Sequence, residues 1–178
     1  QGGEFTIVRA GRVVFTRGNE AVALDTASGD IVILATERFA RLSCVEGTLW
    51  AARVRDAEVV IGVAGPNGFE ARCTVSAPGH WREITSISAD GCWAYGFVDD
   101  GVARHLLEID VKAAKSRRIT EGSVVVAAPV AIRDGAVFLQ ENSCTPLEVH
   151  VYQRHSPPRQ VSRVHAKLNL SAVAEPEV

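Results

Sequence analysis

The stretch "ITSISADGCWAYGFVDD" spans residues Ile84 to Asp100 and determines the fold that we expect. Apolar and polar residues alternate as far as Asp90-Gly91, and a second apolar run follows this pair. The later stretch "APVAIRDGAVFLQEN", from Ala128 to Asn142, has the same pattern. Asp-Gly between two such runs predicts a β-hairpin, because glycine adopts the positive φ that tight hairpin turns require.

The pattern occurs four times, in "EFTIVRAGRVVF", "ARLSCVEGTLWA", "ITSISADGCWAY" and "APVAIRDGAVFL". The shared turn glycines are Gly11, Gly47, Gly91 and Gly135, which are 36, 44 and 44 residues apart. Each hairpin is followed by two further apolar runs with turn-rich links between them. We therefore predict consecutive meanders of four antiparallel strands, and about 40 residues with four strands are typical of one β-propeller blade.

The expected fold class is all-β, with about four β-propeller blades at residues 1–36, 37–79, 80–121 and 122–165. The expected third strands are 20–26, 57–65, 104–111 and 146–153, and the expected fourth strands are 30–35, 69–75, 116–120 and 159–164. No window sustains a helical apolar stripe over three turns. Residues 166–178 depart from the repeat, and we expect them to be a linker towards a further C-terminal domain.

The composition excludes several classes of function. The 178 residues carry a net charge of −2 and 47% hydrophobic residues, which predicts a sizeable core and argues against binding to nucleic acid or to an anionic membrane surface. No apolar run approaches the roughly 20 residues of a membrane helix. The chain has no methionine and no signal-peptide pattern, so we expect it to be part of a longer protein.

Four cysteines are too widely spaced for a CxxC metal or redox motif. They are Cys44, Cys73, Cys92 and Cys144. We expect four reduced, mostly buried thiols, which fit a cytoplasmic protein. The alternative is one disulfide in a periplasmic parent protein.

Two parts of the sequence resemble known families. "ITSISADGCWAYGFVDDGVARHLLEIDVKAAKSRRITEG" is similar to the TolB-like blade pattern, in which S-x-D-G precedes an aromatic-rich strand. "VFLQENSCTPLEVHVYQ" followed by "RQVSRVHAKLNLSAVAEPEV" resembles the end of the propeller in prolyl oligopeptidase-type serine peptidases. The acylaminoacyl peptidase and dipeptidyl peptidase branches are the most similar, although Ser162 stands where those proteins usually have threonine.

The resemblance implies a non-catalytic role for this chain. In that family a separate α/β-hydrolase domain carries the catalytic serine in a G-x-S-x-G motif, which this sequence lacks, so we predict no catalytic residue here. The family's propeller covers the active site, restricts access to small peptides and helps to hold the substrate. The implied partners are therefore a hydrolase domain of the same parent and a peptide substrate.

The segment "PGHWREI" supplies the candidate site. We expect His80, Trp81, Arg82 and Glu83 to lie on the loop entering the third blade, where they would help to gate the substrate. The alternative is that Trp81 caps a blade and that Arg82 and Glu83 form a solvated pair.

Other clusters predict no site. The five histidines lack the close spacing of metal ligands, although the third-strand residues His105 and His150 are expected to be near each other. The glycine-rich segment 62–68 links two strands, which predicts a hairpin loop and not a phosphate-binding loop. Asp99, Asp100 and Asp134 are expected to be solvated turn residues. We predict neither a cofactor nor a metal site.

Two further functions remain as alternatives to the peptidase role. The first is a TolB-like propeller that binds other proteins, and the second is a metal-dependent polysaccharide lyase. If the chain is part of a larger ring, its terminal blades expose apolar faces. We therefore expect self-association, for example as two half-rings that together form an eight-bladed pseudo-ring.

Overall fold

The computed structural model describes residues 5–9, 11–17, 20–36, 41–45, 48–55, 58–65, 67–76 and 80–165. None of these residues is helical, so no described helix could span a membrane. The strands are β1 (Phe5–Arg9), β2 (Arg12–Arg17), β3 (Glu20–Asp25), β4 (Ile31–Ala35), β5 (Arg41–Val45), β6 (Thr48–Arg55), β7 (Glu58–Gly65), β8 (Gly68–Ser76), β9 (His80–Ile87), β10 (Trp93–Asp100), β11 (Ala103–Asp110), β12 (Lys115–Arg118), β13 (Val124–Ile132), β14 (Gly135–Asn142), β15 (Thr145–Gln153) and β16 (Arg159–Gln160).

The strands pair as four consecutive antiparallel meanders, which are β1–β4, β5–β8, β9–β12 and β13–β16. The third and fourth meanders are joined in one sheet by a single parallel pair, Arg104 with Val125. This order agrees with the sequence repeat, and the expected all-β fold is confirmed. The limits of the blades and the linker role of residues 166–178, which lie outside the described residues, stay predictions.

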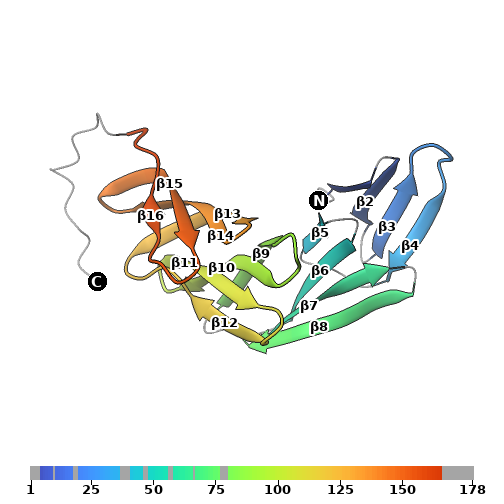
Figure 1. Cartoon of the computed structure of the whole chain (residues 1–178), viewed down its shortest axis with the longest axis horizontal. Helices are drawn as coiled ribbons and strands as arrows, with labels where there is room; N and C mark the ends of the chain where they lie inside the picture. The colour runs from blue at the N-terminus through green and yellow to red at the C-terminus, as the bar shows by residue number, and fades with distance from the viewer. Residues whose placement is uncertain are drawn as a thin grey trace.

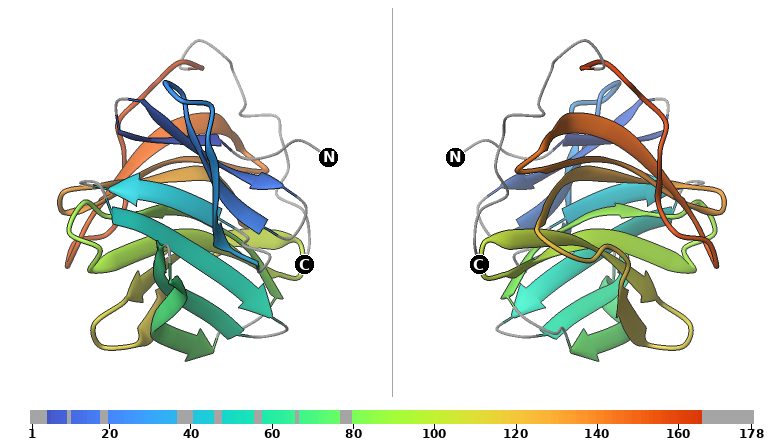
Figure 2. Two further views of the ribbon diagram at one scale, coloured as in Figure 1. Left: turned by 90° about the vertical axis from the view of Figure 1, so that its right-hand side faces the viewer. Right: turned by 90° about the vertical axis from the view of Figure 1, so that its left-hand side faces the viewer.

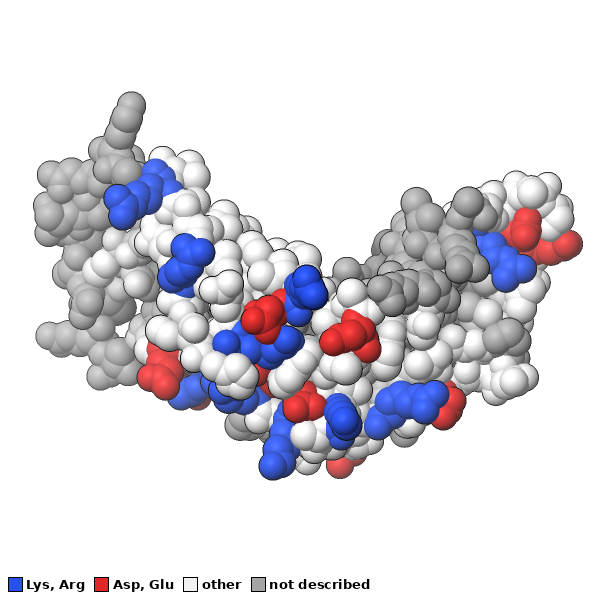
Figure 3. Space-filling view, in the orientation of Figure 1, with Lys and Arg blue, Asp and Glu red and all other residues white. Residues whose placement is uncertain are grey.

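The four meanders follow one another along an arc (Figure 1). Their first strands lie towards the hollow of the arc, where β5 contacts β1 and β9, and β9 contacts β13. The fourth strands lie towards the convex side. The end views show the first and second meanders nearest the viewer from one side and the fourth from the other (Figure 2). On the face shown in Figure 3, most charged side chains lie along the convex side.

Hydrophobic cores fill the spaces between successive meanders. Val14, Ala21 and Ala23 of the first meander pack against residues of the second, including Leu42 and Ala51. The second core joins the second and third meanders through Ala52, Val59, Ile61, Cys73, Val75, Ile84, Ile87, Ala94, Val98, Leu107, Ile109 and Val111. The third core joins the third and fourth meanders through Tyr95, Leu106, Val126, Ala136, Phe138 and Tyr152. Each inner sheet is therefore covered on both faces, as expected for strands with long apolar runs.

The terminal meanders also have apolar outward faces. Residues directly opposite in a sheet share a face, and the register places Phe15, Val22 and Ile33 in one row of the first meander, in which Val22 is fully buried. Ile33 is 45% exposed. On the fourth meander, Val137 lies opposite both Val130 and Val151, on the face away from the third core.

Turn glycines fix the hairpins as the sequence predicts. Gly11, Gly91 and Gly135 have φ values of +89°, +65° and +142°, whereas Gly47 lies outside the described residues. A Cβ atom on Gly91 would collide with the indole of Trp50 in the second meander. A Cβ atom on Gly135 would collide with the backbone carbonyl of Tyr152. These two glycines therefore serve the packing as well as the turn.

Two strand limits differ from expectation. The segment at His80 is not a loop, because β9 begins at that residue and pairs with β10. The last strand was expected at 159–164, but β16 ends at Gln160. Beyond this point the amides of Val161 and Ser162 both donate to the Val149 carbonyl, over 2.8 Å and 3.3 Å, and Ser162 Oγ accepts a hydrogen bond from the Val149 amide over 2.7 Å, so the regular ladder ends.

Gly135→Ala should lower the free energy of unfolding by about 3 kcal/mol or more, because the new methyl group meets backbone that cannot move aside. Gly101→Ala is the matched control: Gly101 also has a positive φ of +60°, but nothing lies within 4 Å of its Cβ position. It should cost only about 1–2 kcal/mol. Urea denaturation measures both values, and equal losses would contradict the close approach at Gly135.

Candidate functional site

A cavity of about 430 Å³ lies between the third and fourth meanders beside their first strands. We call it the inner cavity; it is lined by Glu83, Thr85, Phe97, Arg104, Ala127, Ala128, Pro129 and Val130. Glu83 lies opposite Phe97 in the β9–β10 ladder, so the two side chains share a face. Of the four predicted site residues, Glu83 is therefore placed at a cavity. The side chains of His80, Trp81 and Arg82 lie outside the described part of the structure.

An arginine stacked on an aromatic ring forms another wall of the inner cavity. Arg104 Cζ lies 4.6 Å from the ring centroid of Phe97, and Arg104 Nε donates a hydrogen bond to Asp99 Oδ1 over 3.0 Å. The inner cavity thus has a carboxylate from Glu83, a guanidinium from Arg104 and an aromatic surface. Such a set can bind a polar chain that carries an apolar side group.

A bulge in β13 completes the inner cavity. The register shifts between Ala127 and Val130, and Ala128 has a φ of +46°, which is uncommon for a residue other than glycine. The hydroxyl of Thr85 donates to the Pro129 carbonyl over 2.7 Å, and Ser86 Oγ accepts from the Ala131 amide over 2.8 Å. Bulges and strained backbone occur often beside functional sites, so the wall that faces Glu83 is a specific, hydrogen-bonded feature.

A polar network crosses the same interface further out. Glu108 on β11 is 2% exposed, and it accepts hydrogen bonds from Tyr95 over 3.1 Å, Tyr152 over 3.3 Å and Arg117 over 2.7 Å. Burial and the adjacent Glu108 hold the pKa of the Tyr95 hydroxyl far above its usual value. The hydrogen bond to Glu108 raises the pKa of Arg117. A buried carboxylate is therefore compensated by one cation and two neutral donors.

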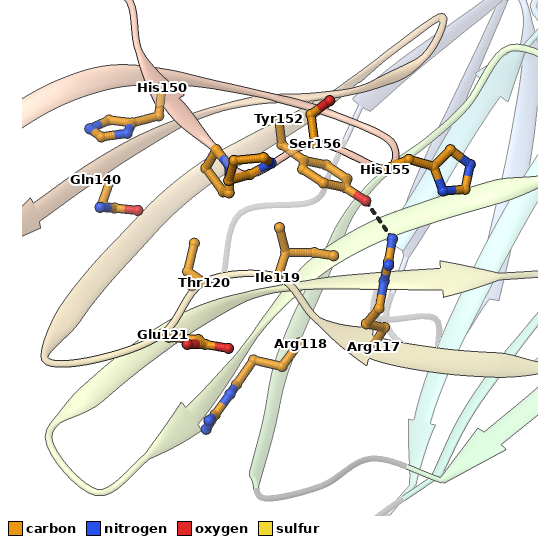
Figure 4. A pocket seen from close by; sticks show the side chains of 12 residues that line it. Arg117, Arg118, Ile119, Thr120, Glu121, Gln140, His150, Tyr152, His155 and Ser156 are labelled. Atoms are coloured by element: carbon orange, nitrogen blue, oxygen red, sulfur yellow. Dashed lines mark hydrogen bonds between the residues drawn. The ribbon is translucent and has the colours of Figure 1, made fainter.

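A larger cavity of about 590 Å³ lies beside this network, towards the fourth strands (Figure 4). We call it the outer cavity; it is lined by Arg117, Arg118, Ile119, Thr120, Glu121, Gln140, His150, Tyr152, His155, Ser156, Pro157 and Pro158. No sequence pattern indicated this cavity, because its walls come from the strands β12, β14 and β15, the link at 119–121 and the turn at 155–158, which no motif connects.

The predicted histidine neighbours have separate environments. Burial lowers the pKa of both His105 and His150. His105 is 3% exposed with Nδ1 3.4 Å from Thr120 Oγ1, whereas the ring of His150 packs against Phe138 at 5.7 Å. Among the residues described, no group of three or more His, Cys, Asp or Glu could hold a metal ion.

The other residues considered in the sequence analysis are the cysteines, the aspartates at the end of β10 and the glycine-rich segment 62–68. Cys73, Cys92 and Cys144 form no disulfide with any described residue, and Cys44 has no described side chain. Asp99 and Asp100 close β10 and pair with Arg104 and Arg118, so they are not only solvated turn residues. Segment 62–68 joins β7 to β8 as a hairpin, as predicted.

The C-terminal described segment is fixed by a buried carboxylate. Glu148 on β15 is 3% exposed and accepts hydrogen bonds from the Ser162 hydroxyl, the Val164 amide over 3.1 Å and the His165 amide over 2.9 Å. These bonds, that of Ser162 first, lower the pKa of Glu148. They hold residues 162–165 against the fourth meander.

Comparison with known proteins supports the fold. No family model matches the chain, and no curated protein matches its sequence. A TolB-like protein from Agrobacterium tumefaciens superimposes with a TM-score of 0.62 and 11% identity, over 92% of this chain and 61% of that chain. A puromycin-hydrolyzing peptidase from Mycobacterium tuberculosis superimposes with a TM-score of 0.65 and 11% identity, over 92% of this chain and 31% of that chain.

A third match is the acylaminoacyl peptidase of Pyrococcus horikoshii, with a TM-score of 0.59 and 13% identity, over 95% of this chain and 29% of that chain. The chain therefore has the β-propeller fold of TolB-like proteins and of these peptidases, as the sequence resemblance predicts. It spans 61% of the TolB-like chain and less than a third of either peptidase.

Glu148→Gln should release the segment at residues 162–165, because a neutral amide accepts these hydrogen bonds less strongly than a carboxylate. We expect amide exchange at Val164 and His165 to become about tenfold faster or more, as measured by NMR. Because the native pKa is lowered, the wild-type protection should be present above the ordinary pKa of about 4.3 and should be lost as pH falls through the native value.

Glu141→Gln, an exposed change on β14, is the control for this prediction and should leave both amides protected. Unchanged exchange at Val164 and His165 in the Glu148 variant would contradict this role of Glu148.

Proposed function

We propose that this chain is the non-catalytic propeller part of a prolyl oligopeptidase-type serine peptidase. In this proposal it gates access and positions the peptide for an α/β-hydrolase domain that is not part of this chain. The main support is the match to two peptidases over more than nine tenths of this chain but under a third of theirs. The absence of a G-x-S-x-G motif from the sequence agrees with a non-catalytic part.

The inner cavity is the proposed contact for the peptide. It adjoins β9 and β13, which lie on the hollow side of the arc, where a closed ring would have its central channel. The Glu83 carboxylate would attract an amino or amide group of the peptide, and the ring of Phe97 would contact an apolar side chain. His80, Trp81 and Arg82 are proposed to extend this contact along β9.

A TolB-like propeller that binds other proteins is the alternative. Its support is the match to a TolB-like structure over 92% of this chain, the same share as for the puromycin-hydrolyzing peptidase. The two proposals differ in whether a hydrolase domain accompanies the propeller in the native protein.

In the full-length parent, Glu83→Gln should raise KM for aminoacyl-anilide and dipeptidyl-anilide substrates about 3- to 10-fold and leave kcat nearly unchanged, as expected for lost substrate binding. Glu70→Gln, which changes an exposed carboxylate on β8, is the matched control and should leave KM unchanged. If the parent hydrolyses these substrates but KM does not respond, the inner cavity is not the peptide contact. If the parent hydrolyses none of them, the interaction-module proposal replaces the peptidase proposal.

We also propose that the isolated chain self-associates through its outward apolar faces, because exposed apolar sheet faces favour association. Multi-angle light scattering should then give about twice the 19.1 kDa chain mass at high protein concentration. Ile33→Lys should shift the protein towards the monomer by placing a charge on one such face. Val102→Lys, at a turn residue that is 90% exposed, should not. A wild-type monomer at every concentration would contradict self-association.

A further inference from the structure

The outer cavity is separate from the inner cavity, and no residue lines both. Its volume of about 590 Å³ lies within the roughly 300–1,000 Å³ that small-molecule sites occupy. Figure 4 shows Arg117, Tyr152 and His155 towards one end, Gln140 and His150 towards the other, and Ile119 and Thr120 between them. Polar side chains therefore line the cavity along its whole length.

The charges around the outer cavity are compensated by the protein itself. Arg117 bonds to the buried Glu108 over 2.7 Å, and Arg118 bonds to Asp100 over 3.0 Å. His150 is half-buried, and this burial favours the neutral imidazole. Glu121 adds one exposed carboxylate at the margin. An anion would meet two arginines that are already paired, and the exposed Glu121 carboxylate would attract a cation only weakly because water screens it. The cavity therefore favours an uncharged ligand.

An unused hydrogen-bonding atom indicates that this ligand is polar. Oε1 of Gln140 is buried and accepts no hydrogen bond within the described structure. A buried acceptor without a donor costs free energy, which a ligand with an O–H or N–H group would recover. Figure 4 shows the Gln140 amide oxygen pointing towards Ile119 and Thr120, across the cavity. A purely apolar ligand would leave this atom unsatisfied.

On the side of the fourth meander, the outer cavity is lined by side chains and not by an unpaired strand edge. Gln140 lies on β14, which pairs with β13 and β15, and His150 pairs with Gln160 of β16. A peptide could therefore not add to this wall as a further strand, which is how extended peptides often bind a sheet. The turn that closes the cavity is held in an uncommon conformation, because His155 has a φ of +69°.

We propose that the outer cavity binds an uncharged sugar of about the size of a disaccharide. Hydroxyl groups both donate and accept hydrogen bonds, so they can satisfy Gln140 together with the imidazole of His150 and the hydroxyl of Ser156. Pro157 and Pro158 offer apolar surface to the C–H face of a sugar ring. This site would be a second ligand site on the propeller, independent of the peptide contact proposed above.

The test is a titration of the chain with maltose, cellobiose and chitobiose, monitored by two-dimensional NMR. Each sugar is added to about 20 mM, a concentration that reveals dissociation constants of a few mM. At least one sugar should shift the Gln140 side-chain amide and the backbone amides of 117–121 and 150–158 saturably. Gln140→Leu should weaken binding about tenfold or more, whereas Glu141→Gln on the same strand should not.

The wild-type titration decides the question even if Gln140→Leu perturbs folding. No saturable shift with any of the three sugars would overturn the proposal, as would shifts confined to other residues. Glycyl-proline is tested in parallel; if this dipeptide shifts the outer-cavity signals and the sugars do not, the site binds peptides and the proposal is wrong.

Discussion

Face-to-face packing of consecutive four-stranded sheets holds this protein together. A meander with apolar residues on both faces cannot be stable in water alone, because each uncovered face leaves apolar surface exposed. Here three cores join the four meanders in sequence, and the two inner meanders are covered on both sides. The arc, the position of the first strands on its hollow side and the apolar faces at its two ends all follow from this packing.

The interface between the third and fourth meanders departs from a purely apolar core, and both cavities lie there. Its centre contains the ring of Phe138 and the Glu108 network, whose hydrogen bonds require one alignment of the two sheets. On either side of this centre a cavity separates the two sheets. The β13 bulge opens the inner cavity on one side, and the 119–121 link and the turn at 155–158 border the outer cavity on the other. A rigid interface thus provides fixed walls for two sites.

Much of the architecture could be predicted from local sequence. Alternation of apolar residues and the turn glycines Gly91 and Gly135 indicated the hairpins, because these signals depend on residues that are neighbours in the chain. The shortened β16 could not be predicted in this way, because the hydrogen bond that fixes the chain just beyond its end joins Ser162 to Glu148, which are 14 residues apart. The start of β9 at His80 was mistaken for a loop, because the apolar alternation that predicts the strand begins only at Ile84.

The candidate site was predicted only in part, because its contacts also join residues that are far apart in the chain. Glu83 was identified by composition, but its cavity depends on Arg104, Phe97 and the bulge at Ala128, which approach it only after the sheets pack. The outer cavity depends on Gln140, whose role appears only when its buried oxygen is seen without a donor.

The most direct test of the peptidase account is to capture the native protein with an antibody against this chain and to react it with a fluorophosphonate probe. Intact-mass analysis then shows whether the probe has been added to a serine of the same polypeptide. The account predicts a polypeptide of about three times the 19.1 kDa of this chain, because the chain spans less than a third of either matched peptidase, and this polypeptide should carry one covalent adduct. A native polypeptide without any fluorophosphonate-reactive serine would contradict it.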